Sequence, residues 1–173
     1  PPDGEKPANY SKPAMALDQI EVMRHFGFER FPVIGQDRGG RVTHRLVLDH
    51  PNAVTHAAVL DIIPTGEAYR RANREFGLGY WHWFFMAQPF DLPERLLQAS
   101  KDYYYGRNRQ LFDPEAFADY YACATRPQTI HAMCEDYRAG ATYDYELDEQ
   151  DRGTRRIACP VLALWAHRGA LSG

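Results

Sequence analysis

Short runs of apolar residues alternate along the chain with longer segments in which apolar residues recur at helical spacing. Residues 31–34, 57–60 and 161–165 have the length and composition of buried strands. Residues 11–26 are predicted to form a helix with its apolar residues roughly on one side, namely Met15, Leu17, Ile20, Met23 and Phe26. Such alternation indicates an α/β fold with a parallel sheet, in which ligands bind at the carboxyl ends of the strands.

The first short strand runs directly into the glycine-flanked sequence GQDRGGR at residues 35–41, and an amphipathic helix is expected to follow. A turn of the form G-x-D-x-G between a strand and a helix is typical of a nucleophile elbow, although by itself it is more often a tight turn. A carboxylate nucleophile attacks saturated carbon or a strained ring and leaves an ester on the enzyme. The sequence therefore points to Asp37, while Asp61 follows the next strand. In the helix, Val42, Leu46 and Val47 are apolar, and Arg45 and Asp49 are polar.

The middle of the chain differs in composition, since 16 of the 23 aromatic residues lie between Tyr80 and Tyr145. Asp113-Pro114-Glu115 marks a helix start, with a capping side chain and proline in the first turn. Arg126-Pro127 ends that helix, and another is predicted to run to about Arg138, before Ala139-Gly140. We expect three segments: a partial core at 1–64, an inserted helical cap at 65–150, and a return to the core at 151–173.

Composition excludes several functional classes. The 173 residues carry a net charge of −3 with both signs interspersed, so nucleic acid is not an expected partner. No apolar run has the length of a membrane span, and the first residues show no signal-peptide pattern, so we expect no membrane partner. The three cysteines are widely spaced, which favours reduced thiols in the cytoplasm and gives no metal-binding pattern.

Four motifs occur in order along the chain: GQDRGGR (35–41), AVLDIIP (58–64), YWHWFF (80–85) and CEDYRAG (134–140). Together they resemble the haloacetate, or fluoroacetate, dehalogenases of the α/β-hydrolase fold, over about residues 9–165. Related epoxide hydrolases and haloalkane dehalogenases lack both arginines of the first motif. The resemblance implies hydrolysis of a carbon–halogen bond in a haloacetate, giving glycolate and halide, without a cofactor.

The resemblance also implies roles for seven residues. Asp37 would be the nucleophile, and Asp61 would orient a general-base histidine. Arg38 and Arg41 would bind the substrate carboxylate, because a guanidinium fork matches a carboxylate and three-residue spacing places both side chains on one helix face. The halide would be held by donors from the cap, namely His82, Trp83 and Tyr137.

The sequence departs from the family pattern in two ways. Gln36 stands where the family usually has a histidine. Because this position is not catalytic, we expect the glutamine to adjust the activity without abolishing it. The catalytic histidine of the family lies beyond the last strand, and the strands and oxyanion-hole loop before the elbow have no counterpart here. We therefore expect a fragment that lacks both ends and is inactive by itself; His167 is not interpreted as the base.

Other interpretations stay open at this point. An epoxide hydrolase would share the Asp37 nucleophile but would use paired cap tyrosines to protonate the ring oxygen, and Arg38 and Arg41 argue against it. A non-catalytic carboxylate-binding remnant is a second alternative. The two arginines could be solvated helix residues, and His82 and Trp83 could be packing residues. The expected partner is a small haloacid, with no nucleic acid or membrane, and a homodimer of the full-length protein is left open.

Overall fold

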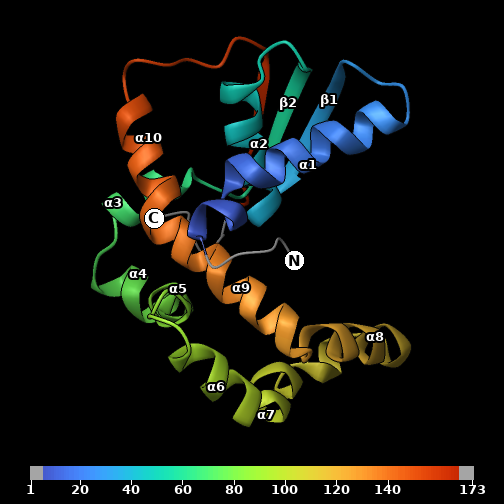
Figure 1. Ribbon diagram of the computed structural model, residues 1–173, viewed down its shortest axis with the longest axis vertical. Coiled ribbons are helices and arrows are strands. Elements are labelled where there is room, and N and C mark those ends of the chain that lie inside the picture. Colours follow the sequence, from blue (N-terminus) through green and yellow to red (C-terminus); the bar gives the residue numbers. More distant parts are fainter. Residues whose placement is uncertain (1–5, 168–173) are drawn as a thin grey trace.

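The computed structural model of the chain describes residues 6–167 and contains a small sheet with helices inserted before its last strand (Figure 1). The ends of the predicted segments 1–64 and 151–173, residues 1–5 and 168–173, lie outside the described residues. The first part comprises η1 (Pro7–Tyr10), α1 (Lys12–His25), β1 (Phe31–Gln36), α2 (Arg38–Asp49) and β2 (Val54–Leu60). The inserted helices are α3 (Thr65–Arg70), α4 (Arg74–Gly79), α5 (Trp81–Met86), α6 (Leu92–Ala99), α7 (Lys101–Gly106), η2 (Arg109–Leu111), α8 (Pro114–Ala124), α9 (Pro127–Ala139), the π-helical turn η3 (Gly140–Asp144) and α10 (Tyr145–Asp151), and β3 (Val161–Leu164) follows.

The three strands form a parallel sheet in the order β1-β2-β3, which confirms the α/β prediction. Gln36 lies opposite Leu60, and Leu60 lies opposite Leu164. The strands therefore end level with one another. Asp37 and Asp61, which follow β1 and β2, lie at the same edge of the sheet.

Helices α1 and α2 cover one face of this sheet (Figure 1). The core between them is apolar and consists of Ala16, Ile20, Phe31, Val42, Leu46, Val47, Val54 and Ala57. The prediction of one apolar face on the first helix is wrong for Leu17 and Phe26, which are 48% and 66% exposed. Ala16 and the first-turn residue Lys12 are buried in their place. The helix thus presents a narrower apolar stripe than its composition suggests.

The prediction of fully buried strands is also wrong among the described residues. Ile34 is 73% exposed, and all four residues of β3 are exposed. Successive side chains of a strand point to opposite faces, and the described helices pack on only one of those faces. Among residues 6–167, no helix combines the length and the apolar character that a membrane crossing needs.

The inserted helices begin and end largely where the sequence indicates. The Asp113 carboxylate accepts hydrogen bonds from the backbone of Glu115 (2.9 Å) and Ala116 (3.1 Å), which caps α8. Pro127 then begins α9. In Figure 1 the helices α4–α8 form an arc away from the sheet, and α9 leads back toward it.

Helix α9 ends at Ala139, one residue beyond the predicted end at about Arg138, but the helical path continues through η3 into α10. Gly140 keeps helical dihedral angles (φ −58°, ψ −44°) and is buried. A Cβ there would lie 3.7 Å from Thr65 Cγ2 and 3.9 Å from Tyr69 Cε2. Glycine at this position therefore allows close packing against α3 and does not act as a helix terminator.

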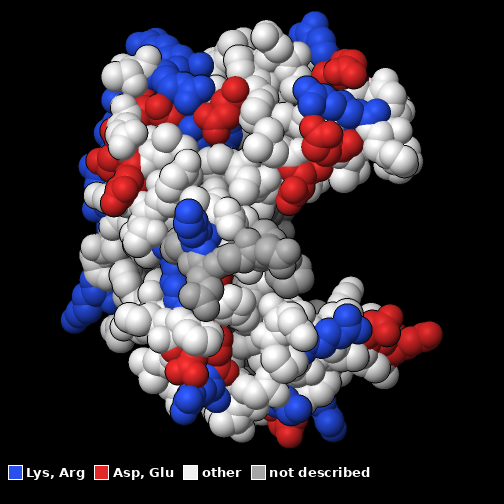
Figure 2. Space-filling model, viewed as in Figure 1, with Lys and Arg blue, Asp and Glu red and all other residues white. Residues whose placement is uncertain are grey.

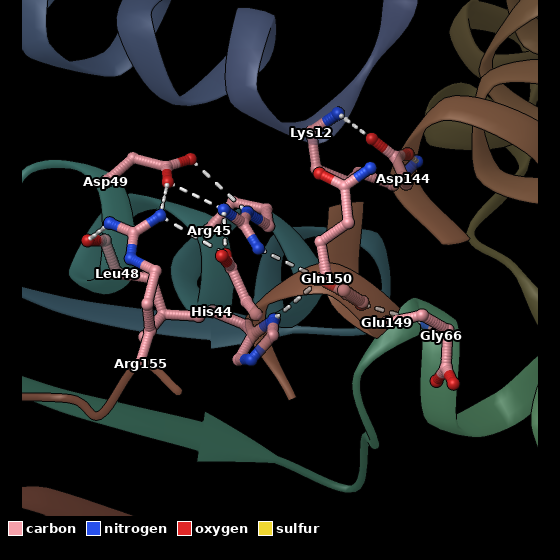
Figure 3. Close-up of polar contacts among 12 residues, drawn as sticks. Lys12, His44, Arg45, Leu48, Asp49, Gly66, Asp144, Glu149, Gln150 and Arg155 are labelled. Carbon is pink, nitrogen blue, oxygen red and sulfur yellow. Dashed lines mark hydrogen bonds and ion pairs between the residues drawn. The ribbon is translucent and has the colours of Figure 1, made fainter. Parts of the chain in front are cut away.

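Arg45 is a deeply buried charged side chain that joins α2 to α10 (Figure 3). Its guanidinium donates to Asp49 (2.6 Å), Asp148 (3.1 Å) and Asp151 (2.9 Å). Asp148 in turn accepts from the backbone N–H of Gly66 at 2.8 Å, which fixes the start of α3. Burial lowers the pKa of Arg45, but the hydrogen bonds to Asp49 and Asp151 outweigh it and the pKa is raised. Elsewhere, on the face in Figure 2, charges of both signs are interspersed.

Arg45→Met should destabilise the full-length protein by about 3–5 kcal/mol, because it leaves the buried Asp148 and its neighbours without their cation. Urea unfolding measures the change. Arg24→Met is the matched control, since Arg24 pairs with Glu21 on the surface, and it should stay within about 0.5 kcal/mol. A loss below about 1 kcal/mol for Arg45→Met would contradict the prediction.

Candidate functional site

The turn between β1 and α2 is strained and tightly packed. Asp37 adopts φ 52° and ψ −122°, a conformation that non-glycine residues rarely hold and that clusters at functional sites. A Cβ on Gly35 would lie 2.4 Å from the backbone oxygen of Gly39, and one on Gly40 would lie 2.3 Å from Ile62 Cγ1. Glycine is therefore required at 35 and 40, whereas position 39 has open space around it.

Asp61 is the second non-glycine residue with a positive φ (48°) in the described part of the chain. Its backbone N–H donates to Leu164 O at 2.9 Å, and its carboxylate accepts from the Ala166 N–H. These bonds hold Asp61 at the ends of β2 and β3. Asp61 does not contribute to the wall of the pocket described next.

A small pocket lies over the strained turn, between α2 and the inserted helices. Its volume of about 20 Å³ has room for one or two water-sized groups. Its wall combines three cations (Lys12, Arg38, Arg41), two carboxylates (Asp37, Asp136), three aromatic residues (Tyr69, Trp83, Tyr137), and Thr65 and Gly140. The elements α1, α2, α3, α5 and α9 all contribute to it.

Arg41 is buried with an incomplete set of partners. Its Nη1 lies 3.5 Å from Asp37 Oδ1, and its guanidinium stands 4.5 Å from the centre of the Trp83 ring. Burial lowers the pKa of Arg41, and the nearby Asp37 only partly opposes this effect. Arg41 Nε is buried and has no hydrogen-bond partner among the described residues. A buried donor without a partner is costly and is a feature of sites that receive a ligand.

Arg38 is held from one side by α9. Its Nε lies 2.6 Å from Asp136 Oδ2, and its guanidinium stands 5.2 Å from the centre of the Tyr137 ring. Burial lowers the pKa of Arg38, but Asp136, Tyr137 and Asp37 together outweigh this effect, so that the pKa is raised. The pairing occupies Nε and, among residues 6–167, no ion pair occupies the two terminal nitrogens of the fork.

A buried network behind the pocket fixes Asp136. The Lys12 ammonium lies 2.7 Å from Asp136 Oδ1 and 3.1 Å from Asp144 Oδ2, and all three side chains are at most 6% exposed. The backbone N–H of Lys12 also donates to Asp144 at 3.0 Å. Asp136 therefore bridges α1 and α2, and it cannot rotate away without breaking the ion pair of Arg38 and one of the two ion pairs of Lys12.

The aromatic side of the site comes from α5 and α9. Trp83 is buried, and its ring centre lies 6.0 Å from that of Tyr137. His82 packs edge-on against Tyr137, with ring centres 5.8 Å apart, but does not line the pocket. Burial lowers the pKa of His82 and raises the pKa of Tyr137. At neutral pH both side chains are therefore uncharged and can donate hydrogen bonds.

The structure thus brings Asp37, Arg38, Arg41, Trp83 and Tyr137 into one pocket, with His82 behind Tyr137 and Asp61 at the adjacent strand end. The sequence interpretation missed five residues of the wall, namely Lys12, Thr65, Tyr69, Asp136 and Gly140. Asp136 lies within CEDYRAG and could have been found there. Lys12 and Tyr69 carry no local signal, because only the packing of distant helices places them in the wall.

One other cluster has a metal-ligand composition. The ligand atoms of Glu94, His131 and Glu135 lie within 4.8 Å of one another. Arg138 Nη1, however, stands 2.6 Å from both Glu94 Oε1 and Glu135 Oε1. The guanidinium already supplies the positive charge that a metal ion would bring, so these residues do not fit a metal site.

Comparison with known proteins gives related hydrolases. The family model for the alpha/beta hydrolase fold matches residues 2–171. A fluoroacetate dehalogenase from Burkholderia sp. is 45% identical over 95% of this chain and 56% of its own length. A soluble epoxide hydrolase from Corynebacterium sp. (strain C12) is 29% identical over 93% of the chain and 59% of its own length.

Solved structures agree with these matches. A structure from Nostoc sp. PCC 7120, described as an α/β hydrolase, has a TM-score of 0.89 and 48% identity over 98% of this chain and 60% of that one. A structure from Pseudomonas aeruginosa, described as an epoxide hydrolase, has a TM-score of 0.88 and 42% identity over 99% of this chain and 59% of that one. The chain thus spans less than two thirds of these relatives.

Gly35→Ala should disrupt the strained turn, because the added Cβ would overlap the Gly39 carbonyl, which is backbone and cannot move aside. We expect a loss of stability of about 2 kcal/mol or more, within the range for overpacking and strain. Gly39→Ala should be neutral or stabilising by up to about 1 kcal/mol, since it replaces an uncrowded helical glycine. Urea unfolding of both variants checks the contrast, and equal effects would contradict it.

Proposed function

The chain belongs to the α/β-hydrolase fold family, and we propose that its site hydrolyses the carbon–halogen bond of a small haloacid of the fluoroacetate type. An Asp37 oxygen attacks the halogen-bearing carbon, the carbon–halogen bond breaks, and halide leaves with the bonding electrons. Water then attacks the ester carbonyl of Asp37, which releases glycolate and restores the carboxylate.

The observation that carries the proposal is the pairing of a strained, accessible carboxylate with two arginines in one small pocket. The Asp37 side chain is 72% exposed, so a substrate carbon can reach it. The fork of Arg38 and the unpartnered Nε of Arg41 supply donors for the substrate carboxylate. The pocket is small, with a volume of about 20 Å³, which favours a small substrate over a large one.

The aromatic residues serve the departing halide in this proposal. Fluoride is a poor leaving group, and donors fixed where its charge develops would lower the barrier. The lowered pKa of His82 and the raised pKa of Tyr137, both caused by burial, keep these side chains neutral. Trp83 adds its indole N–H. The dehalogenase from Burkholderia sp. supports this assignment through its similarity.

Asp61 is assigned to orienting a general-base histidine that activates the hydrolytic water. Its position at the strand end next to Asp37 supports this role. No hydrogen bond or ion pair joins Asp61 to a histidine within residues 6–167. The proposal further treats residues 65–150 as a cap over the core, and the cytoplasmic location and haloacid partner stay predictions.

Epoxide hydrolysis is the second candidate. Two tyrosines, Tyr69 and Tyr137, line the pocket, and burial raises the pKa of both. A pair of tyrosine hydroxyls could protonate the oxygen of an opening ring while Asp37 attacks its carbon. The similarity to epoxide hydrolases supports this alternative, whereas Arg38 and Arg41 favour an acid substrate.

Asp37→Asn should abolish halide release from haloacetate in the full-length protein, because an amide is too weak a nucleophile. A single turnover of the unmodified protein in ¹⁸O-water should place the label in the Asp37 carboxylate. Mass spectrometry of the Asp37 peptide measures the label. Label that appears only in glycolate would replace the ester by direct attack of water.

Arg41→Met should raise the KM for haloacetate by about tenfold or more, since a hydrogen bond to a charged group contributes about 1.5–3 kcal/mol. The KM for the neutral haloacetamide should change little. Arg95→Met serves as a control, because Arg95 forms an exposed pair with Asp91 away from the pocket. Equal losses on the charged and neutral substrates would assign Arg41 to packing. A preference of the unmodified protein for a neutral epoxide would favour the second candidate.

A further inference from the structure

Tyr69, on α3, lines the pocket and carries a buried hydroxyl group. Its oxygen is buried and has no hydrogen-bond partner among the described residues. Buried polar groups in folded proteins are nearly always paired, so an unpaired hydroxyl on a pocket wall requires an explanation. Neither the family resemblance nor the proposed mechanism gives this residue a role in dehalogenation.

Packing accounts for the ring but not for the hydroxyl. The Tyr69 ring meets Trp83 edge-on at 5.2 Å between centres, and it also contacts Phe84 (6.1 Å) and Tyr145 (6.4 Å). A phenylalanine would make all three contacts without burying an unpaired oxygen. The hydroxyl is therefore a cost to the folded state that a group bound in the pocket would offset.

The neighbours of Tyr69 indicate the charge of that group. The Arg41 guanidinium stands 4.5 Å from the centre of the Trp83 ring, so Arg41 and Tyr69 both contact Trp83. Arg41 Nε is likewise buried and unpartnered in the part of the chain that the structure describes. Burial raises the pKa of Tyr69 far above its usual range, so the group stays protonated and remains a donor. Two unpaired donors on the wall of one pocket match an acceptor that carries negative charge.

We propose that Tyr69 is a further ligand-binding residue, whose hydroxyl donates a hydrogen bond to an anion bound in the pocket that it lines with Arg41. The inference rests on the proposed function for the nature of the anion, which is either the carboxylate of the haloacid or the departing halide. A carboxylate oxygen and a halide ion accept the same kind of hydrogen bond. Separate ligands distinguish these two sources.

The test uses Tyr69→Phe in the full-length protein, with Tyr105→Phe as the matched control. Tyr105, on α7, also has a buried, unpartnered hydroxyl, and burial also raises its pKa, but it does not line the pocket. Both variants should unfold at a temperature equal to or above that of the unmodified protein, because each loses an unpaired buried oxygen. Only Tyr69→Phe should weaken ligand binding.

Binding is measured by calorimetry with acetate, and by inhibition of turnover with sodium fluoride and sodium chloride. If the hydroxyl contacts the carboxylate, Tyr69→Phe should raise the Kd of acetate about tenfold or more, with halide inhibition unchanged. If it contacts the halide, the inhibition constants should rise instead. Tyr105→Phe should alter neither.

Two results would overturn the inference. Unchanged acetate and halide constants in Tyr69→Phe would show that the hydroxyl does not reach the ligand, and a lower unfolding temperature in this variant alone would show a structural partner. Acetate binding requires no turnover. Weaker acetate binding in Tyr69→Phe would thus support the inference even if the unmodified protein does not hydrolyse haloacetate. If the unmodified protein does hydrolyse haloacetate, and the acetate and halide constants are the same in Tyr69→Phe and Tyr105→Phe, the inference is refuted while the proposed function stands.

Discussion

A guanidinium buried in the core cannot exist without anions around it, and Arg45 draws those anions from two parts of the chain. Asp49 comes from its own helix, whereas Asp148 and Asp151 come from α10, more than 100 residues later. Helix α2, which carries Arg45, begins directly after Asp37, and α10 continues the path of α9. The position of α9 above the strained turn, and with it the pocket, therefore depends on this one charge and its partners.

The pocket is arranged by a second set of buried charges. Lys12 and Arg38 compete for Asp136, which satisfies both from opposite oxygens. The pocket that Asp136 and Arg38 line also contains Arg41, whose Nε is buried without a partner among the described residues. Donors that are fixed before a ligand arrives need no reorganisation on binding, which is the arrangement that stabilises developing negative charge best.

The sequence predicted what depends on local signals. The strand, the glycine-rich turn and the helix around Asp37 follow each other within 20 residues, and the Asp113 cap and Pro127 start are equally local. What it missed depends on partners far along the chain. Lys12 and Arg45 are residue types usually found on the surface, and they are buried because carboxylates 103 to 132 residues away surround them. The error is the opposite one for Leu17 and Ile34, which were expected to be buried but are exposed, because no described helix packs over them.

Because of the π-helical turn at Gly140–Asp144, the number of residues in this segment sets the direction in which α10 presents its side chains. In an uninterrupted α-helix, Asp144 would point about 80° away from Asp136. The wider turn brings both carboxylates onto Lys12. Removing one residue here would rewind the turn and swing α10 around its axis, so that Asp148 and Asp151 would miss Arg45. Natural variation in this segment is thus expected to avoid insertions and deletions, and to keep Gly140 and Asp144, which pack against α3 and pair with Lys12.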